Sequence, residues 1–257
     1  MVLIEHSTNT TVTHTAFTGT GNTETVDLYE VGIPMTNIEV YLPLDGDVID
    51  YSGNKVVITN NGATVSSGLR GKSSYNFVSA STDSIDIGYG NTFNPFTSAI
   101  SVSLWVYWNG GDSDACLGVN VGTNQRFYLG AISSKWDMGI QNSGWGTGGA
   151  VTTATSATWT HLVIVMNAGV ASMYVDGVSS FSKNYTSYAF TSDIDIGRIG
   201  TTGLYWDGKI QDVRVYTQVL TLSEINTLYK MFDPTEMHQI QFNNDGSMNV
   251  FGEVKEI

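Results

Sequence analysis

The sequence predicts an all-β fold, a sandwich or jelly roll of short antiparallel strands. Gly, Ser, Thr and Asn are abundant, whereas only four prolines and 14% charged residues are present. Short alternating segments recur between turn residues, and Asn61-Gly62 and Asp176-Gly177 tolerate the positive φ of tight hairpins. This composition and spacing favour many short strands over helices. A chain of 257 residues with 41% hydrophobic residues can bury one substantial core.

The central region, residues 37–230, contains the regular series of strand-like segments. In one of them Val102, Leu104 and Val106 alternate with more polar neighbours, which indicates a strand with one face in the core. The strand pattern covers residues 39–44, 55–59, 74–77, 84–87, 101–108, 126–132, 136–141, 161–167, 171–175, 193–196 and 209–216. One helix is expected from Thr221, because Thr221 and Glu224 have capping-box spacing and an apolar face follows. Asp233-Pro234 ends it.

The two ends differ from the central region. Residues 1–36 are rich in Thr and contain too few apolar residues for a core, so we expect an extended β arm that lies against something else. In residues 231–257 two strand-like runs flank an Asn243-Asn244-Asp245-Gly246 turn, which predicts a terminal β-hairpin. A lone hairpin is marginal in water, and we expect it to dock on a partner or on its own copy.

Charge, cysteine content and hydropathy exclude several classes of partner. The net charge is −13 and only 11 Lys and Arg are present, so neither nucleic acid nor an anionic membrane surface is an expected partner. No apolar stretch approaches the roughly 20 residues of a membrane span. The amino terminus lacks the pattern of a signal peptide. Cys116 is the single cysteine, which excludes an intrachain disulfide, and it is interpreted as a buried small side chain.

Several segments in the same order resemble the concanavalin A-like lectin/glucanase superfamily, in its laminin G-like and pentraxin-like branch. The resemblance covers about three quarters of the chain, and it implies a jelly-roll sandwich of two curved antiparallel sheets. Ser223 departs from it, because relatives often carry an acid there. The matching segments are Leu42-Pro43-Leu44-Asp45-Gly46-Asp47, Asp50-Tyr51-Ser52-Gly53-Asn54, residues 100–106, 159–163, 173–178, 196–198, 206–216, 220–225 and 228–229.

The resemblance also implies a structural calcium ion. In related folds the acid before the Val-Arg-Val-Tyr strand often supplies oxygen ligands, and here that acid is Asp212. Asp45 or Asp47 would be its partner from the early strand, since a hard cation needs several oxygen ligands. In the alternative interpretation Asp45-Gly46 is simply a turn and Asp212 pairs with Arg214.

Glycan binding is the functional option that the resemblance suggests, because aromatic faces stack on the apolar faces of sugars. Trp145 in a glycine-rich segment and Trp206 next to Tyr205 are the best candidates among loop aromatics, with structural packing as their alternative role. Trp105 and Trp159 are assigned to the core instead.

No catalytic constellation is evident. A glycosidase needs paired carboxylates, yet no Glu occurs between residues 40 and 223. Asp86 and Asp195 alternate with Ile, which an exposed strand face explains equally well. His161 is interpreted as a packed residue at the start of a buried strand. We therefore expect no enzymatic activity.

The ends suggest a subunit of a larger assembly. The terminal hairpin resembles those of bacteriophage fibres and appendages over about fifteen residues. The leading hypothesis is a structural virion protein, made in the host cytoplasm, that decorates a capsid or forms part of a fibre. Its partners would be other virion proteins, its own copies and cell-surface glycans. A carbohydrate-binding lectin module is the alternative, and a divergent glycoside hydrolase is the third.

Overall fold

The structure is a computed structural model that describes residues 24–27, 33–88, 99–111, 113–122, 125–141, 152–185, 193–200, 204–232, 239–242 and 248–251. Contacts within the chain group residues 35–225 into one compact unit, and residues 1–34 with 226–257 into a second. In the part of the chain that the structure describes, no helix reaches the length and apolar character of a membrane span.

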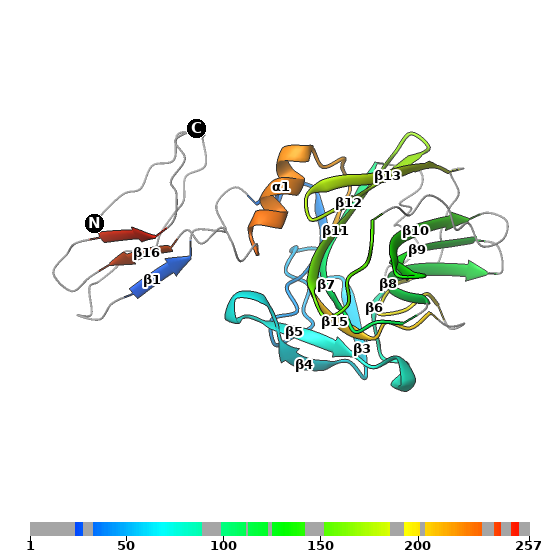
Figure 1. The fold of residues 1–257 in the computed structure, drawn as a ribbon, viewed down its shortest axis with the longest axis horizontal. Coiled ribbons are helices and arrows are strands. Elements are labelled where there is room, and N and C mark those ends of the chain that lie inside the picture. Colours follow the sequence, from blue (N-terminus) through cyan, green and yellow to red (C-terminus); the bar gives the residue numbers. More distant parts are fainter. Residues whose placement is uncertain are drawn as a thin grey trace. The chain divides into compact units, whose positions relative to one another are not determined.

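The larger unit is a sandwich of two antiparallel sheets, which confirms the predicted jelly roll (Figure 1). The first sheet has six strands, and the second has eight because β2 also pairs with β15. The six-stranded sheet runs β10 (Lys135–Gln141), β9 (Gln125–Ile132), β8 (Ser113–Gly122), β14 (Ile194–Ile196), β6 (Ser84–Gly88) and β3 (Val57–Asn61). The eight-stranded sheet runs β13 (Val178–Asn184), β12 (Val170–Val175), β11 (Trp159–Asn167), β7 (Ile100–Trp108), β15 (Gly208–Tyr216), β5 (Ser73–Phe77) and β4 (Thr64–Ser67), with β2 (Ile38–Leu42) beside β15.

Two turn predictions have different outcomes. Asp176 and Gly177 both have positive φ and join β12 to β13 as an antiparallel hairpin, as expected. Gly62 also has positive φ, but it follows a strand of the six-stranded sheet and precedes a strand of the eight-stranded sheet. Asn61-Gly62 is therefore a crossing between sheets, and the hairpin expected there is wrong. A residue with positive φ occurs both in the hairpin turn and in the crossing between sheets. Only the sheet that the following strand joins distinguishes the two.

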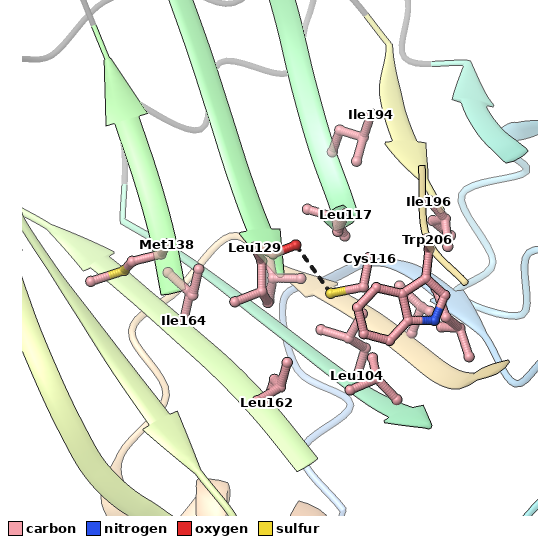
Figure 2. Packing of buried hydrophobic residues seen from close by; sticks show 14 of the residues in the cluster. Leu104, Cys116, Leu117, Leu129, Met138, Leu162, Ile164, Ile194, Ile196 and Trp206 are labelled. Carbon is pink, nitrogen blue, oxygen red and sulfur yellow. Dashed lines mark hydrogen bonds between the residues drawn. The ribbon is translucent and has the colours of Figure 1, made fainter. Parts of the chain in front are cut away.

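The core between the sheets is apolar and includes Trp108, Trp136 and Trp206. Figure 2 shows Trp206 among buried aliphatic side chains. Trp136 lies between two others, with ring centroids 6.3 Å from Trp108 and 6.4 Å from Trp206. Cys116 is buried as predicted, and its thiol donates to the carbonyl oxygen of Leu129 at 3.2 Å. Burial raises the pKa of this thiol well above its ordinary range, so it stays protonated and unreactive.

The expected helix is α1 (Leu222–Lys230). The carboxylate of Glu224 accepts hydrogen bonds from the backbone N–H and the hydroxyl of Thr221, and the Glu224 N–H donates to that hydroxyl in return. This reciprocal pair is the capping box that the sequence predicts.

The two ends of the chain meet in one small sheet. β1 (Glu24–Asp27) pairs with β16 (Gln239–Phe242), which pairs with β17 (Met248–Phe251). The expected hairpin is present as β16 and β17, and its added strand comes from the N-terminal arm of the same chain. Residues 1–23 and 28–32 of the arm lie outside the described residues.

Strand β15 contains a buried ion pair at a bulge. Its register against β7 shifts between Gln211 and Arg214, and Asp212 in the bulge has φ 54°. The guanidinium of Arg214 donates to both carboxylate oxygens of Asp212 at 2.9 Å, and it lies 4.1 Å from the ring centroid of Tyr41. Burial by itself would lower the pKa of Arg214, but the Asp212 carboxylate raises it above its ordinary value.

This ion pair gives a double-mutant test. Asp212→Asn leaves a buried guanidinium without its counter-charge, and we expect a loss of about 3–5 kcal/mol in the free energy of unfolding. Adding Arg214→Met removes the unpaired charge and should recover most of that loss. Urea unfolding of the wild type, both single variants and the double variant measures the coupling. If the losses in free energy of unfolding of the two single variants simply added in the double variant, the two side chains would not be coupled and the prediction would be wrong.

Candidate functional site

The structure describes two of the three predicted glycan-binding aromatics, Tyr205 and Trp206. Trp206 is 0% exposed and stacks on Trp136 with 28° between the ring planes. It is therefore a core residue, and the prediction that it presents a loop aromatic to sugar is wrong. Tyr205 is half-buried beside Ala115 of β8 and stays a prediction. Trp145 lies outside the described residues.

The three predicted calcium ligands have separate partners. Both oxygens of Asp212 are bound by Arg214, the alternative that the sequence allowed. Asp45 accepts from the Ser73 N–H and lies 3.5 Å from the Lys72 ammonium, while Asp47 accepts from the Ile49 N–H and the Tyr51 hydroxyl. Over the described residues, no three acidic, His or Cys side chains form a group suited to a metal ion. Calcium binding stays a prediction of the resemblance alone.

Asp86 and Asp195, in contrast, are brought together. They are directly opposed in the register of β6 and β14, and one guanidinium nitrogen of Arg198 lies 3.0 Å from Asp86 and 3.2 Å from Asp195. Asp86 also accepts from the Asn61 amide and the Ser84 hydroxyl, and Asp195 accepts from the Gly200 N–H. The Asp195 side chain is only 9% exposed, so the expected exposed face is wrong for this residue.

Burial dominates the ionisation of this acid pair. Desolvation raises the pKa of Asp195 to about 6, Arg198 opposes the rise, and the negative charge of Asp86 adds to it. Both carboxylates already accept hydrogen bonds on both of their oxygens. Such a cluster ties strands β3, β6 and β14 to the segment after β14.

A second arrangement lies on the outer face of the eight-stranded sheet, opposite the core. Trp159 of β11 is paired with Tyr107 of β7, which is paired with Lys209 of β15. Just beyond these strands the Asn109 amide donates to Asp207 at 3.1 Å. Asn109 is exposed and the other four side chains are half-buried. We call Trp159, Tyr107, Lys209, Asn109 and Asp207 the Trp159 surface.

The aromatic and polar groups of the Trp159 surface are held in place by one another. The Tyr107 and Trp159 rings are edge to face, with centroids 5.7 Å apart and planes at 61°. The Lys209 ammonium lies 5.3 Å from the Tyr107 ring centroid and within 3.3 Å of the Ser67 carbonyl and hydroxyl oxygens. The Asn109 N–H also donates to the Asp207 carbonyl oxygen. These contacts fix an aromatic ring beside hydrogen-bonding groups.

The next residues along the same face are covered. Trp105 and His161 are buried, with ring centroids 5.1 Å apart, and His161 is 2.8 Å from the Ser103 hydroxyl. Burial lowers the pKa of His161 to about 3, and the charge of Arg214 adds to the effect. His161 is therefore neutral and packed, as its sequence position predicts. Gln211 is buried as well and accepts from the Leu69 N–H.

Sequence reasoning missed the Trp159 surface because it assigned Trp159 to the core. The alternation along each strand contained a signal for this surface. Each of three side chains lies on the odd-numbered face of its strand, two residues before or after a buried residue of that face: Trp159, Tyr107 and Lys209. Without the register of β11, β7 and β15, nothing placed the three side by side.

Comparison with known proteins identifies the family. The pattern of residues 79–226 matches the family described as the concanavalin A-like lectin/glucanases superfamily. The chain belongs to this superfamily. Among curated proteins, adhesion G-protein coupled receptor V1 of Danio rerio is 29% identical over 87 residues, which are 32% of this chain and 1% of the receptor. The chain thus matches only a small part of that relative.

Solved structures share the fold of this superfamily member. The binding domain of Paraclostridial Mosquitocidal Protein 1 has a TM-score of 0.65 at 16% identity, over 79% of this chain and 54% of that chain. Domain 4 of AbnA, an extracellular arabinanase from Geobacillus stearothermophilus determined with arabinotriose, has a TM-score of 0.62 at 21% identity. It is matched over 75% of this chain and 98% of that domain.

The Asp195 site predicts a pH dependence of stability. Its pKa is raised in the folded state, so its contribution to stability is fully present below the ordinary pKa of 3.8 and is lost as pH rises through about 6. We expect Asp195→Asn to abolish this decline, which is a few kcal/mol at most. Urea unfolding at steps between pH 4 and 7 measures it. Asp193→Asn, a change at an exposed acid, is the control, and an identical pH profile for both variants would contradict the assignment.

Proposed function

We propose that the sandwich is a non-catalytic carbohydrate-binding module and that the Trp159 surface binds the sugar. The observation that carries the proposal is a half-buried Trp159 in edge-to-face contact with Tyr107, at the end of the sheet where Asn109 is hydrogen-bonded to Asp207. An aromatic face stacks on the apolar face of a sugar, while amide and carboxylate groups bind its hydroxyls. Both kinds of group lie together on this surface.

The structural neighbours support binding rather than cleavage. One neighbour is the binding domain of Paraclostridial Mosquitocidal Protein 1, and another is a domain of an arabinanase determined with arabinotriose. AbnA domain 4 is matched over nearly its whole length. The sandwich of this chain is therefore comparable in extent to a complete module of a carbohydrate-active enzyme.

A glycoside hydrolase is the less favoured function. Its two carboxylates would have to be Asp86 and Asp195, and the raised pKa of Asp195 would suit a general acid. Both groups are instead occupied by Arg198 and by local hydrogen bonds, and Asp195 is nearly enclosed. A substrate would have to displace Arg198 before either carboxylate could reach it.

Glycan-array binding of the intact chain tests the proposal. We expect Trp159→Ala to weaken binding by roughly tenfold or more, because it removes the stacking face. Trp159→Phe, which keeps a ring, should retain part of the affinity. Tyr51→Ala removes an exposed aromatic from another loop and should have no effect. An array without hits, or hits that survive Trp159→Ala, would reject the proposal.

We also propose that the chain serves as a structural virion protein of a bacteriophage, either in capsid decoration or in a fibre. The arrangement that favours this role is the pairing of strands from both parts of the chain in the sheet β1, β16 and β17, which belongs to a separate compact unit. Strands of four residues form a sheet that is marginal by itself. Attachment to virion proteins or to further copies of the chain would stabilise it.

Removal of residues 1–34 tests the attachment role. We expect the truncated chain to keep the melting temperature of the sandwich but to lose incorporation into particles, because β16 loses β1, one of its two partner strands. Particle incorporation is measured in a complementation assay with the full chain as reference. Normal incorporation of the truncated chain would show that the terminal sheet is not the attachment element.

A further inference from the structure

We infer that the Trp159 surface selects neutral sugars and takes them as a single ring or a twisted chain, not as a flat crystalline surface. The inference rests on the proposed glycan binding and concerns its specificity. It follows from the angle between the two rings and from the charges that surround them.

The ring geometry excludes a flat platform. A sugar stacks only when its apolar face is parallel to the aromatic ring. The planes of Trp159 and Tyr107 differ by 61°, so one planar ligand cannot stack on both. The Lys209 ammonium also lies over the Tyr107 ring. Trp159 is therefore the stacking residue, and a second sugar ring could meet Tyr107 only after a large rotation of the chain.

The charges favour a ligand without a net charge. Lys209 and Asp207 contribute one positive and one negative charge, so the surface itself is balanced. The Lys209 ammonium is engaged by Ser67 and by the Tyr107 ring, and Arg198 and Arg214 bind carboxylates elsewhere. An acidic sugar would meet the Asp207 carboxylate on a chain of net charge −13, while the Lys209 ammonium is already held by Ser67 and Tyr107. Repulsion thus disfavours uronic and sialic acids.

The hydrogen-bonding groups suit hydroxyls beside the stacked ring. Asp207 is held by the Asn109 amide at 3.1 Å, and a carboxylate and an amide oxygen both have lone pairs for further donors. Asn109 is two residues beyond Tyr107 on the same face, which makes it a diagonal neighbour of Trp159, roughly 7 Å away. One small oligosaccharide can therefore touch the ring and both acceptors.

Asp207→Asn distinguishes a neutral from an acidic ligand by the sign of its effect. For arabinotriose and maltoheptaose as neutral probes, we expect about a tenfold or greater loss of affinity. The reason is that the substitution replaces a charged acceptor, which makes stronger hydrogen bonds to sugar hydroxyls, by a neutral amide. For oligogalacturonate the same variant should bind better, because it removes repulsion. Asp193→Asn is the matched control for net charge. Wild-type preference for oligogalacturonate, weakened by Asp207→Asn, would overturn the inference.

Pull-down on microcrystalline cellulose tests the shape requirement. We expect no retention of the intact chain, while a soluble neutral oligosaccharide binds in calorimetry and Trp159→Ala abolishes that binding. Retention on crystalline cellulose that depends on Trp159 would overturn the inference and leave the proposed glycan binding intact. Failure of every soluble and crystalline probe would instead reject the glycan-binding function itself.

Discussion

The bulge at Asp212 in β15, with its buried pair to Arg214, is the constraint on which the arrangement of the sandwich depends. Residues 208–210 of β15 pair with β5, and residues 213–216 pair with β2, while β7 lies along the other edge. The bulge in the β7 ladder lies at the point along β15 where the partner on the other edge changes from β5 to β2. Asp212 in the bulge is only 1% exposed, and Arg214 satisfies both of its carboxylate oxygens. Asp212 therefore has two roles: its positive φ forms the bulge, and its carboxylate pairs with the buried Arg214 guanidinium.

The same interruption separates two parts of the outer sheet face. After the bulge, Arg214 and Tyr216 are fully buried, and Arg214 lies against Tyr41. Before it, Lys209 and Asp207 lie on half-buried positions beside Tyr107. On this strand, the outer face is accessible to solvent only along the first half of β15 and beside it. Its position follows from the topology, because these residues are distant in sequence and adjacent only through β7.

The sequence could predict strands and turns but not their partners. Alternation located β7 and β15, and the capping box located α1, because these signals are local. The registers that join Trp159 to Tyr107 and Asp86 to Asp195 are non-local, and several pairings fit the same alternation. The burial of Trp206 in the core was also not predicted, because its neighbours in sequence, Tyr205 and Asp207, are polar loop residues and suggest exposure. Loop composition indicates exposure on average, yet a single large side chain can still fill the core.

Trp206 also anchors the segment that carries Asp207 of the proposed binding surface. The segment between β14 and β15 begins at Gly197, whose N–H is bonded to Cys116, and the Trp206 N–H donates back to the Gly197 carbonyl oxygen. Asp195 holds the Gly200 N–H near the start of this segment, while Trp206 anchors its end in the core. Asp207 follows directly after that anchor. Its carboxylate is thus placed before a ligand arrives, and an acceptor that is already ordered costs less conformational entropy on binding. In the proposed function, the acid cluster and the core tryptophan would therefore contribute to sugar recognition indirectly, by positioning Asp207.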